Sequence, residues 1–290
     1  SEPTTPTPAV PAGPLPSAGG SFASNDALLS EKMGRRLRST LRTQHDAVTQ
    51  LAATIVLPEP DGGATVVALY EYSLFEVCVA KGGKTKEARR KCADEATTDG
   101  GEPMAALRAC TGRGLVRARF GPPPASNPAY GGKLTVAATR PVAGGCTVEK
   151  IHAFRLHDVD GDRRPELEVD LVTTTPNMTF RDPERYDVRQ RTIGWYREDL
   201  EPQFEGELGS WGLEGEVMES TEARRFALTD VDGDGGIDLE LETWEIDPSD
   251  CTLKLDAWEA SVRACSTDAS ESTKAVWRYD RGKDAWVEPA

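Results

Sequence analysis

One acidic loop occurs twice in this chain. Residues 154–162 read Phe-Arg-Leu-His-Asp-Val-Asp-Gly-Asp, and residues 226–234, which lie 72 positions later, read Phe-Ala-Leu-Thr-Asp-Val-Asp-Gly-Asp. Each copy has three carboxylates at alternate positions and a glycine that allows a tight turn. A hard cation that needs several oxygen ligands at once suits this pattern, and Ca²⁺ fits it best. The sequence therefore predicts two calcium sites.

The expected ligands occupy equivalent positions in the two loops. In such a loop the side chains at positions 1, 3, 5 and 9 and the backbone carbonyl at position 7 face the ion. The ligands predicted in the first loop are Asp158, Asp160, Asp162, the carbonyl of Arg164, and Glu166. Those predicted in the second loop are Asp230, Asp232, Asp234, the carbonyl of Gly236, and Asp238. An EF-hand also has a glutamate at position 12, where this chain has Val169 and Leu241, so neither loop is a standard EF-hand.

A second interpretation of these loops needs no metal. Aspartate and glycine are good turn formers, so an acidic turn can be a plain connection. Several carboxylates in one small loop would then repel one another. In the first loop Arg163 and Arg164 stand where the second loop has two glycines, and they could neutralise part of the charge themselves.

The residues around each loop alternate between apolar and polar types. Residues 153–156 and 226–228 precede the loops with this period of two, and residues 167–171 and 239–242 follow them with it. Such alternation is typical of half-buried strands. Each acidic loop is therefore predicted to join two strands, whereas an EF-hand loop joins two helices.

The pattern D-x-D-G-D-x-x-x-[DE]-L between two strands resembles the FG-GAP/VCBS-type repeats. The resemblance covers about 20 residues in each repeat. In that family the loops bind calcium at the edges of β-propeller blades in extracellular proteins, so the resemblance implies calcium and an extracellular location. Two repeats are too few for a closed propeller. We therefore expect a compact β-rich repeat domain, either propeller-blade-like or a sandwich.

Composition divides the chain into four segments. Residues 1–22, rich in Pro, Thr, Ala and Gly, are predicted to be a flexible tether, which would suit a lipid anchor upstream of Ser1. Residues 23–58 carry apolar side chains mostly three and four positions apart, which predicts an amphipathic helix. Residues 59–146 form a cysteine-bearing α/β segment, and residues 147–290 form the two-repeat calcium-binding domain. The predicted fold class is mainly β, or α+β for the whole chain.

Further elements follow from local patterns. Ser24 or Asn25 would cap the helix. The predicted strands outside the loops are residues 64–80, 133–139 and 147–157, and the predicted short helices are residues 84–97 and 102–110. Beyond each loop lies an aromatic strand, at residues 195–197 and 277–279, and the second continues into a hairpin that ends at residue 287. The aromatic side chains could line a sugar-binding surface, but those on strands more often fill a core.

The six cysteines favour disulfides. They form an even set with no CxxC pair, which disfavours zinc and thioredoxin-like chemistry. The pairs predicted from spacing are Cys251 with Cys265 and Cys78 with Cys92, which leaves Cys110 with Cys146. Free buried thiols are the alternative. Disulfides persist in oxidising compartments, where calcium is also abundant, so an extracytoplasmic location is expected.

Charge and hydropathy exclude several classes of partner. The net charge of −14 would repel nucleic acids and anionic membranes. The chain has no apolar run long enough to span a bilayer, which takes about 18 residues or more. The hydrophobic fraction of 38% is sufficient for a core. A protein partner or an assembly at a surface is therefore the expected interaction.

Catalytic motifs are absent from the sequence. It has no HExxH, GxSxG or phosphate-binding GxxxxGK[ST] pattern. The acid-rich residues 205–211 could pair carboxylates for glycoside hydrolysis. We therefore expect a non-enzymatic extracytoplasmic protein in which calcium stiffens β-hairpins for protein binding or assembly. The alternative is a secreted hydrolase or carbohydrate-active protein with structural calcium.

Overall fold

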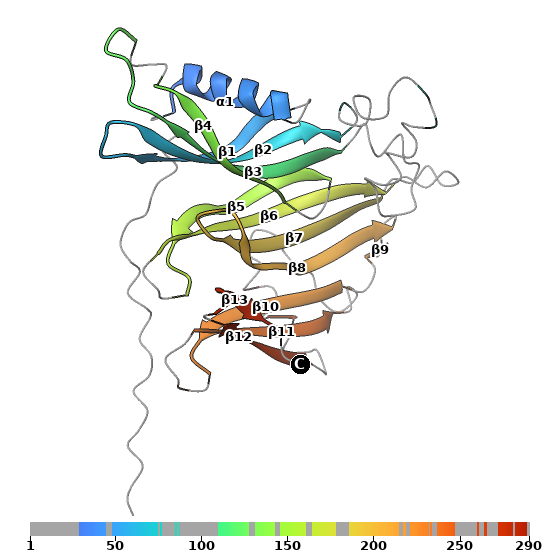
Figure 1. Ribbon diagram of the computed structural model, residues 1–290. Helices are drawn as coiled ribbons and strands as arrows, with labels where there is room; N and C mark the ends of the chain where they lie inside the picture. Colours follow the sequence, from blue (N-terminus) through green and yellow to red (C-terminus); the bar gives the residue numbers. More distant parts are fainter. Residues whose placement is uncertain are drawn as a thin grey trace, which may run out of the picture.

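The computed structural model places one helix and thirteen strands, in two open antiparallel sheets, among the residues that it describes. These residues are 29–44, 48–74, 76, 85, 87, 110–127, 131–142, 146–160, 164–177, 186–214, 217–218, 221–231, 233, 237–246, 260, 264–265, 272–280 and 282–288. The mainly β fold class predicted from the sequence is confirmed. Figure 1 shows the helix on one side of the N-terminal sheet and the second sheet on the other side.

Helix α1 (Glu31–Gln44) is shorter than the sequence predicted. Its N-cap is Ser30, whose Oγ accepts a hydrogen bond from the backbone N–H of Met33 at 3.2 Å. The expected caps, Ser24 and Asn25, lie outside the described residues, as does the tether predicted at residues 1–22.

Strand β1 (Val48–Pro58) replaces the second half of the helix predicted over residues 23–58. That part of the prediction is wrong. Thr54, Ile55 and Val56 are consecutive β-branched residues, whose side chains favour the extended backbone of a strand over a helix. The apolar spacing that suggested a helix also fits the buried face of this strand.

The N-terminal sheet has four strands and is buried on both faces. In the order of the sheet, the strands are β1, β2 (Ala64–Ser73), β3 (Thr111–Phe120) and β4 (Leu134–Pro141). Leu37 and Leu41 of α1 pack on one face, against Val66 and other apolar side chains. On the other face, Leu69 and its neighbours pack against the second sheet. The apolar run of β2 follows from burial on both faces.

The second sheet contains the two predicted repeats. Its strands are β5 (Thr147–His157), β6 (Glu166–Asn177), β7 (Tyr186–Tyr196), β8 (Pro202–Glu214), β9 (Val217–Met218), β10 (Thr221–Thr229), β11 (Asp238–Ile246), β12 (Ser272–Asp280) and β13 (Ala285–Val287). The order is β13-β12-β11-β10-β8-β7-β6-β5, and β9 pairs with β8. Strands β5–β8 form one four-stranded meander and β10–β13 form another. The two join edge to edge through β8 and β10.

The acidic loops lie at the same place in both meanders. The first loop joins β5 to β6, where Leu156 pairs with Leu167, and the second joins β10 to β11, where Leu228 pairs with Leu239. Both hairpins thus have the same register, offset by the 72 positions of the sequence repeat. The prediction that each loop joins two strands is confirmed.

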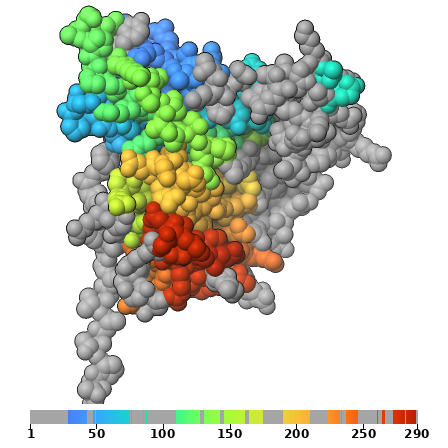
Figure 2. Space-filling model, viewed as in Figure 1, coloured from blue at the N-terminus to red at the C-terminus, as the bar shows by residue number. Residues whose placement is uncertain are grey.

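Aromatic side chains fill the core on one face of the second sheet. Trp195, Phe204 and Trp286 are buried there, with Trp277 and Tyr279 packed against them. The ring of Trp195 lies 5.2 to 5.3 Å, centroid to centroid, from those of Phe204 and Trp286. The prediction that these aromatics belong to the core is confirmed. Figure 2 shows the N-terminal elements at the top of the view and the last strands, in red, at the bottom.

One predicted disulfide is present among the described residues. Cys110 and Cys146 are bonded, with their Cα atoms 4.5 Å apart, and connect the start of β3 to the start of β5. Cys265 is also disulfide-bonded, but Cys251, its predicted partner, lies outside the described residues, as do Cys78 and Cys92. Most of the short helices expected at residues 84–97 and 102–110 also lies outside them. No described helix is long and apolar enough to cross a membrane.

Candidate metal site

The first acidic loop brings together three of its predicted ligands. One carboxylate oxygen from each of Asp158, Asp160 and Glu166 lies within 4.8 Å of the others. The side chains of Asp160 and Glu166 are buried, with 9% and 3% of their surface exposed, and Asp158 is half-buried. Carboxylates held this close and away from water favour a cation between them. We call these three residues the acidic triad, and its oxygens could hold a metal ion.

Of the other two predicted ligands of the first loop, only Arg164 lies in the part of the chain that the structure describes. Asp162 lies outside the described residues, together with Arg163. Arg164 is described and exposed, which is compatible with a backbone carbonyl as its contribution. Oxygen ligands supplied by carboxylates and a carbonyl suit a hard divalent cation such as Ca²⁺ or Mg²⁺.

A hydrogen bond across the loop orients the last member of the triad. Glu166 Oε2 accepts the backbone N–H of Val159 at 2.7 Å. The second loop has the equivalent bond, in which Asp238 Oδ2 accepts the backbone N–H of Val231 at 3.2 Å. In each loop the carboxylate at position 9 therefore accepts a hydrogen bond from the backbone N–H at position 2. This common bond shows that the sequence repeat extends to side-chain geometry.

The second loop is described only in part. Asp230 Oδ1 accepts the backbone N–H of Gly233 at 2.7 Å, which closes a turn. Gly233 has φ of +78°, a left-handed conformation that glycine adopts without strain. Asp232, Asp234 and Gly236 lie outside the described residues. The second calcium site therefore stays a prediction.

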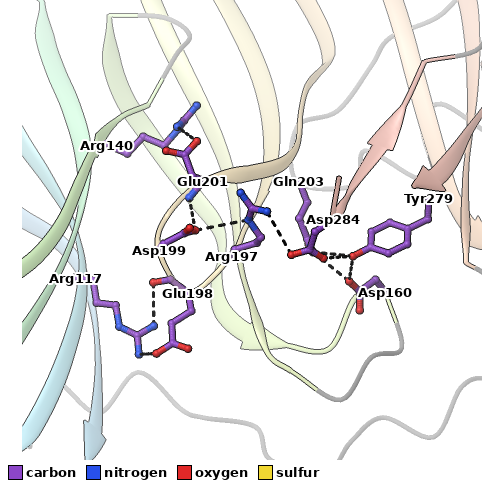
Figure 3. Close-up of polar contacts among 10 residues, drawn as sticks. All are labelled: Arg117, Arg140, Asp160, Arg197, Glu198, Asp199, Glu201, Gln203, Tyr279 and Asp284. Atoms are coloured by element: carbon purple, nitrogen blue, oxygen red, sulfur yellow. Dashed lines mark hydrogen bonds and ion pairs between the residues drawn. The ribbon is translucent and has the colours of Figure 1, made fainter. Parts of the chain in front are cut away.

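Two residues outside the first loop hold the side chain of Asp160 in place. Its Oδ2 accepts hydrogen bonds from Tyr279 Oη at 2.6 Å and from Gln203 Nε2 at 3.1 Å. Tyr279 Oη also contacts Asp284, so one hydroxyl proton serves two carboxylates (Figure 3). Burial raises the pKa of Tyr279, and its hydrogen bonds to the two carboxylates raise that pKa further. Tyr279 therefore stays a neutral donor to the acidic triad.

A chain of polar contacts continues from Tyr279 to the N-terminal sheet. Arg197 Nη1 lies 3.4 Å from Asp284 Oδ2, and its Nε lies 3.6 Å from Asp199. The hydrogen bond from Tyr279 lowers the pKa of Asp284, and Arg197 lowers it further. In the same turn between β7 and β8, Glu201 pairs with Arg140 of β4 at 3.0 Å (Figure 3).

Sequence reasoning missed Gln203, Tyr279 and Asp284 as partners of the loop. Tyr279 was predicted only as part of an aromatic strand, and it lies 119 positions after Asp160. No local pattern connects these residues. They meet because β8, β12 and β13 converge beside the first loop.

Two other acids of β6 have basic partners across the sheet. Asp170 makes two hydrogen bonds with Arg191, at 3.0 and 2.7 Å. Glu168 lies 2.8 Å from both Arg155 and His157. Burial alone would raise the pKa of Glu168, but the hydrogen bonds and charges of these partners outweigh burial and lower it. These acids form ion pairs within the sheet, beside the acidic triad.

Comparison of the chain with protein-family models, with curated proteins and with solved structures found no match.

Proposed function

We propose that this chain is an extracytoplasmic calcium-binding protein in which the ions stiffen β-hairpins that serve protein binding or assembly. The acidic triad is the observation that carries the proposal. Its oxygens lie within 4.8 Å of one another, and two of its three side chains are buried. A bound Ca²⁺ would offset their repulsion and stabilise the folded loop, since the loop ligands come together only on folding.

The choice of calcium rests on ligand chemistry and on compartment. All the candidate ligands are oxygens, with no histidine or thiolate that would favour zinc or copper. The Cys110–Cys146 disulfide suits an oxidising compartment, periplasmic, secreted or at the cell surface, where calcium is abundant. The FG-GAP/VCBS-like pattern leads to the same ion, and we take each four-stranded meander as a blade-like unit.

The role in binding rests on the second loop. Val231, at position 2 of that loop, exposes 45% of its surface and is the exposed large hydrophobic residue of the described part of the chain. An exposed apolar side chain on an acidic loop would contact a protein partner once the ion fixes the loop. In this role the calcium is structural and makes no contact with the partner.

Thermal unfolding with calcium and with chelator tests the proposal. We expect calcium to raise the melting temperature, because a ligand at 100 times its Kd stabilises by about 2.7 kcal/mol, and magnesium to raise it less. Asp160→Asn should remove the part of this rise in melting temperature that is due to the first site. Asp232→Ala should remove the part that is due to the second site. The double variant should not respond to calcium.

Asp170→Asn is the matched control. Asp170 is a buried acid of the same hairpin, but Arg191 already neutralises it. This variant should lower the melting temperature by the same amount with calcium and with chelator. If Asp160→Asn and Asp232→Ala behave in that way too, the loops are plain turns and the proposal fails.

A further inference from the structure

A cavity of about 280 Å³ lies on the face of β6, β7 and β8 opposite the acidic triad. Val169 and Leu171 of β6 line it, and their side chains point away from the face that carries Glu166, Glu168 and Asp170, because neighbouring residues of a strand alternate. Val142, just after β4, lines it from the N-terminal sheet. The cavity therefore lies at the junction of the two sheets, which is a common place for ligand sites.

Gly194 opens the floor of this cavity. It pairs with Val169 on one side and with Glu205 on the other, so the middle of a cross-strand row has no side chain. The ring of Tyr196 borders this position, because a Cβ on Gly194 would lie 2.6 Å from Tyr196 Oη. Any larger residue at Gly194 would displace that ring and narrow the cavity.

The cavity has an apolar side and an acidic side. Val142, Val169 and Leu171 form the apolar side, and Glu205 and Glu207 of β8 form the acidic side. Glu205 accepts the hydroxyl of Tyr196 at 2.8 Å, and its other oxygen lies 4.0 Å from Arg140.

Glu207 differs from Glu205 in its partners. Its Oε2 accepts Gln190 Nε2 at 2.6 Å, a neutral donor. Among the described residues its carboxylate has no ion-pair partner. It is half-buried beside apolar side chains, where a charge gains more from a counter-ion than it does in open solvent.

The arrangement suits binding better than glycoside hydrolysis. Glu205 and Glu207 lie two positions apart on one strand, so their carboxylates line the same wall. Hydrolysis requires two carboxyl groups that flank the scissile bond from opposite sides. What the cavity offers is two carboxylates on β8 and two apolar side chains on β6, on the same face of the sheet with β7 between them.

We propose that this cavity binds an organic cation that consists of an ammonium group on a short apolar stem. The ammonium pairs with Glu207 and lies beside Glu205, and the stem packs on Val169 and Leu171. The same chemistry is found in a free amine and in the lysine side chain of a partner protein. The site is independent of calcium binding, since it uses none of the loop residues.

Three probes of matched size test the proposal at saturating calcium. Hexylamine is compared with hexanol and hexanoate by titration calorimetry and by methyl NMR spectra. We expect hexylamine to bind about five to ten times more tightly than hexanol, because the half-buried carboxylate adds an ion pair to the same apolar contact, and hexanoate to bind most weakly. The shifts of aliphatic methyl groups should be confined to the residues that line the cavity, Val142, Val169, Leu171 and Ile193.

Glu207→Gln should abolish the preference for hexylamine over hexanol. Glu245→Gln, at an exposed position of β11, is the matched control and should keep it. Nα-acetyl-lysine amide distinguishes the two sources of the cation. Tighter binding of this probe than of hexylamine would assign the cavity to a partner's lysine.

Two results would overturn the proposal. One is equal binding of hexylamine and hexanol to the unmodified protein. The other is an amine preference that Glu207→Gln and Glu245→Gln leave equally intact. Neither result bears on the calcium response, so failure here and failure of the proposed function can be told apart.

Discussion

The two acidic loops share a motif, a strand register and a hydrogen bond, yet their surroundings differ. Val159 in the first loop is 2% exposed, whereas the equivalent Val231 is 45% exposed. Asp158 is half-buried within the acidic triad, whereas the equivalent Asp230 is exposed and accepts a hydrogen bond from Gly233 of its own loop. The motif thus determines the local turn. The neighbouring strands determine whether an ion there would support the core or a surface.

The largest expected difference between the two loops is the loss of stability when the valine at position 2 is replaced by alanine. Val159→Ala should lower the free energy of unfolding by about 2 kcal/mol, because it removes buried methyl groups and leaves a cavity. Val231→Ala should change it by less than about 0.5 kcal/mol, as is usual for an exposed residue. Urea unfolding in calcium measures both. Equal losses would mean that the two loops are embedded to the same extent.

The next effect concerns calcium affinity. Tyr279→Phe removes the hydroxyl that orients Asp160, and the loss of such a supporting bond lowers metal affinity by about tenfold or more. Calorimetric titration of the variant in an Asp232→Ala background, where only the first loop binds, would measure this. The same substitution combined with Asp160→Asn should leave the affinity of the second loop unchanged. A drop in that affinity would contradict the separation of the two sites.

The smallest expected effect is on acid stability. The pKa of Glu168 is lower in the folded chain than its ordinary value of 4.5. This lowering stabilises the fold above about pH 4.5, and the stabilisation is lost as the pH falls through the folded pKa. The Glu168→Gln variant should therefore lose less stability than the unmodified protein as the pH is lowered from 7 to about 3. Denaturant midpoints measured across this pH range would show the difference.

The equivalent residue of the second repeat provides the control for this measurement. Glu240 pairs with Lys274 at 3.2 Å on an exposed face, and exposed pairs contribute little. Glu240→Gln should leave the pH dependence as it is. If Glu240→Gln reduces the pH dependence of stability as much as Glu168→Gln does, burial of the ion pair is not what distinguishes the two repeats.

Local patterns predicted the two strands that flank the first loop and three of the acids that the loop brings together. Alternation over residues 153–156 and 167–171 needed no distant partner to be recognised, and the triad members come from one short segment. Strand β3 was not among the predicted strands, and its Gly112 and Gly114 are of a type that is uncommon inside a strand. A Cβ at either glycine would lie within 2.5 Å of the ring of Tyr72 or Tyr70 on β2, so the glycines make room for two tyrosines.

Contacts between distant segments were beyond sequence reasoning. Tyr279 and Asp284 reach the first loop only because the second sheet curves enough to bring its last hairpin there. The boundary between α1 and β1 was missed for a related reason. The apolar residues after Gln44 fit both a helical and an extended spacing, and packing against β2 decides between them.

The seam between the two repeats has a mechanical consequence. In the described residues β8 and β10 pair at Gly209 and Ala223 alone, whereas β7 and β8 pair along most of their length. The aromatic core crosses the seam, since Trp195 belongs to one meander and Trp286 to the other. Side-chain packing, more than backbone pairing, therefore holds the repeats together. Force applied across this seam would therefore act mainly on the contacts between aromatic rings, and little backbone pairing would be lost if the two meanders separated.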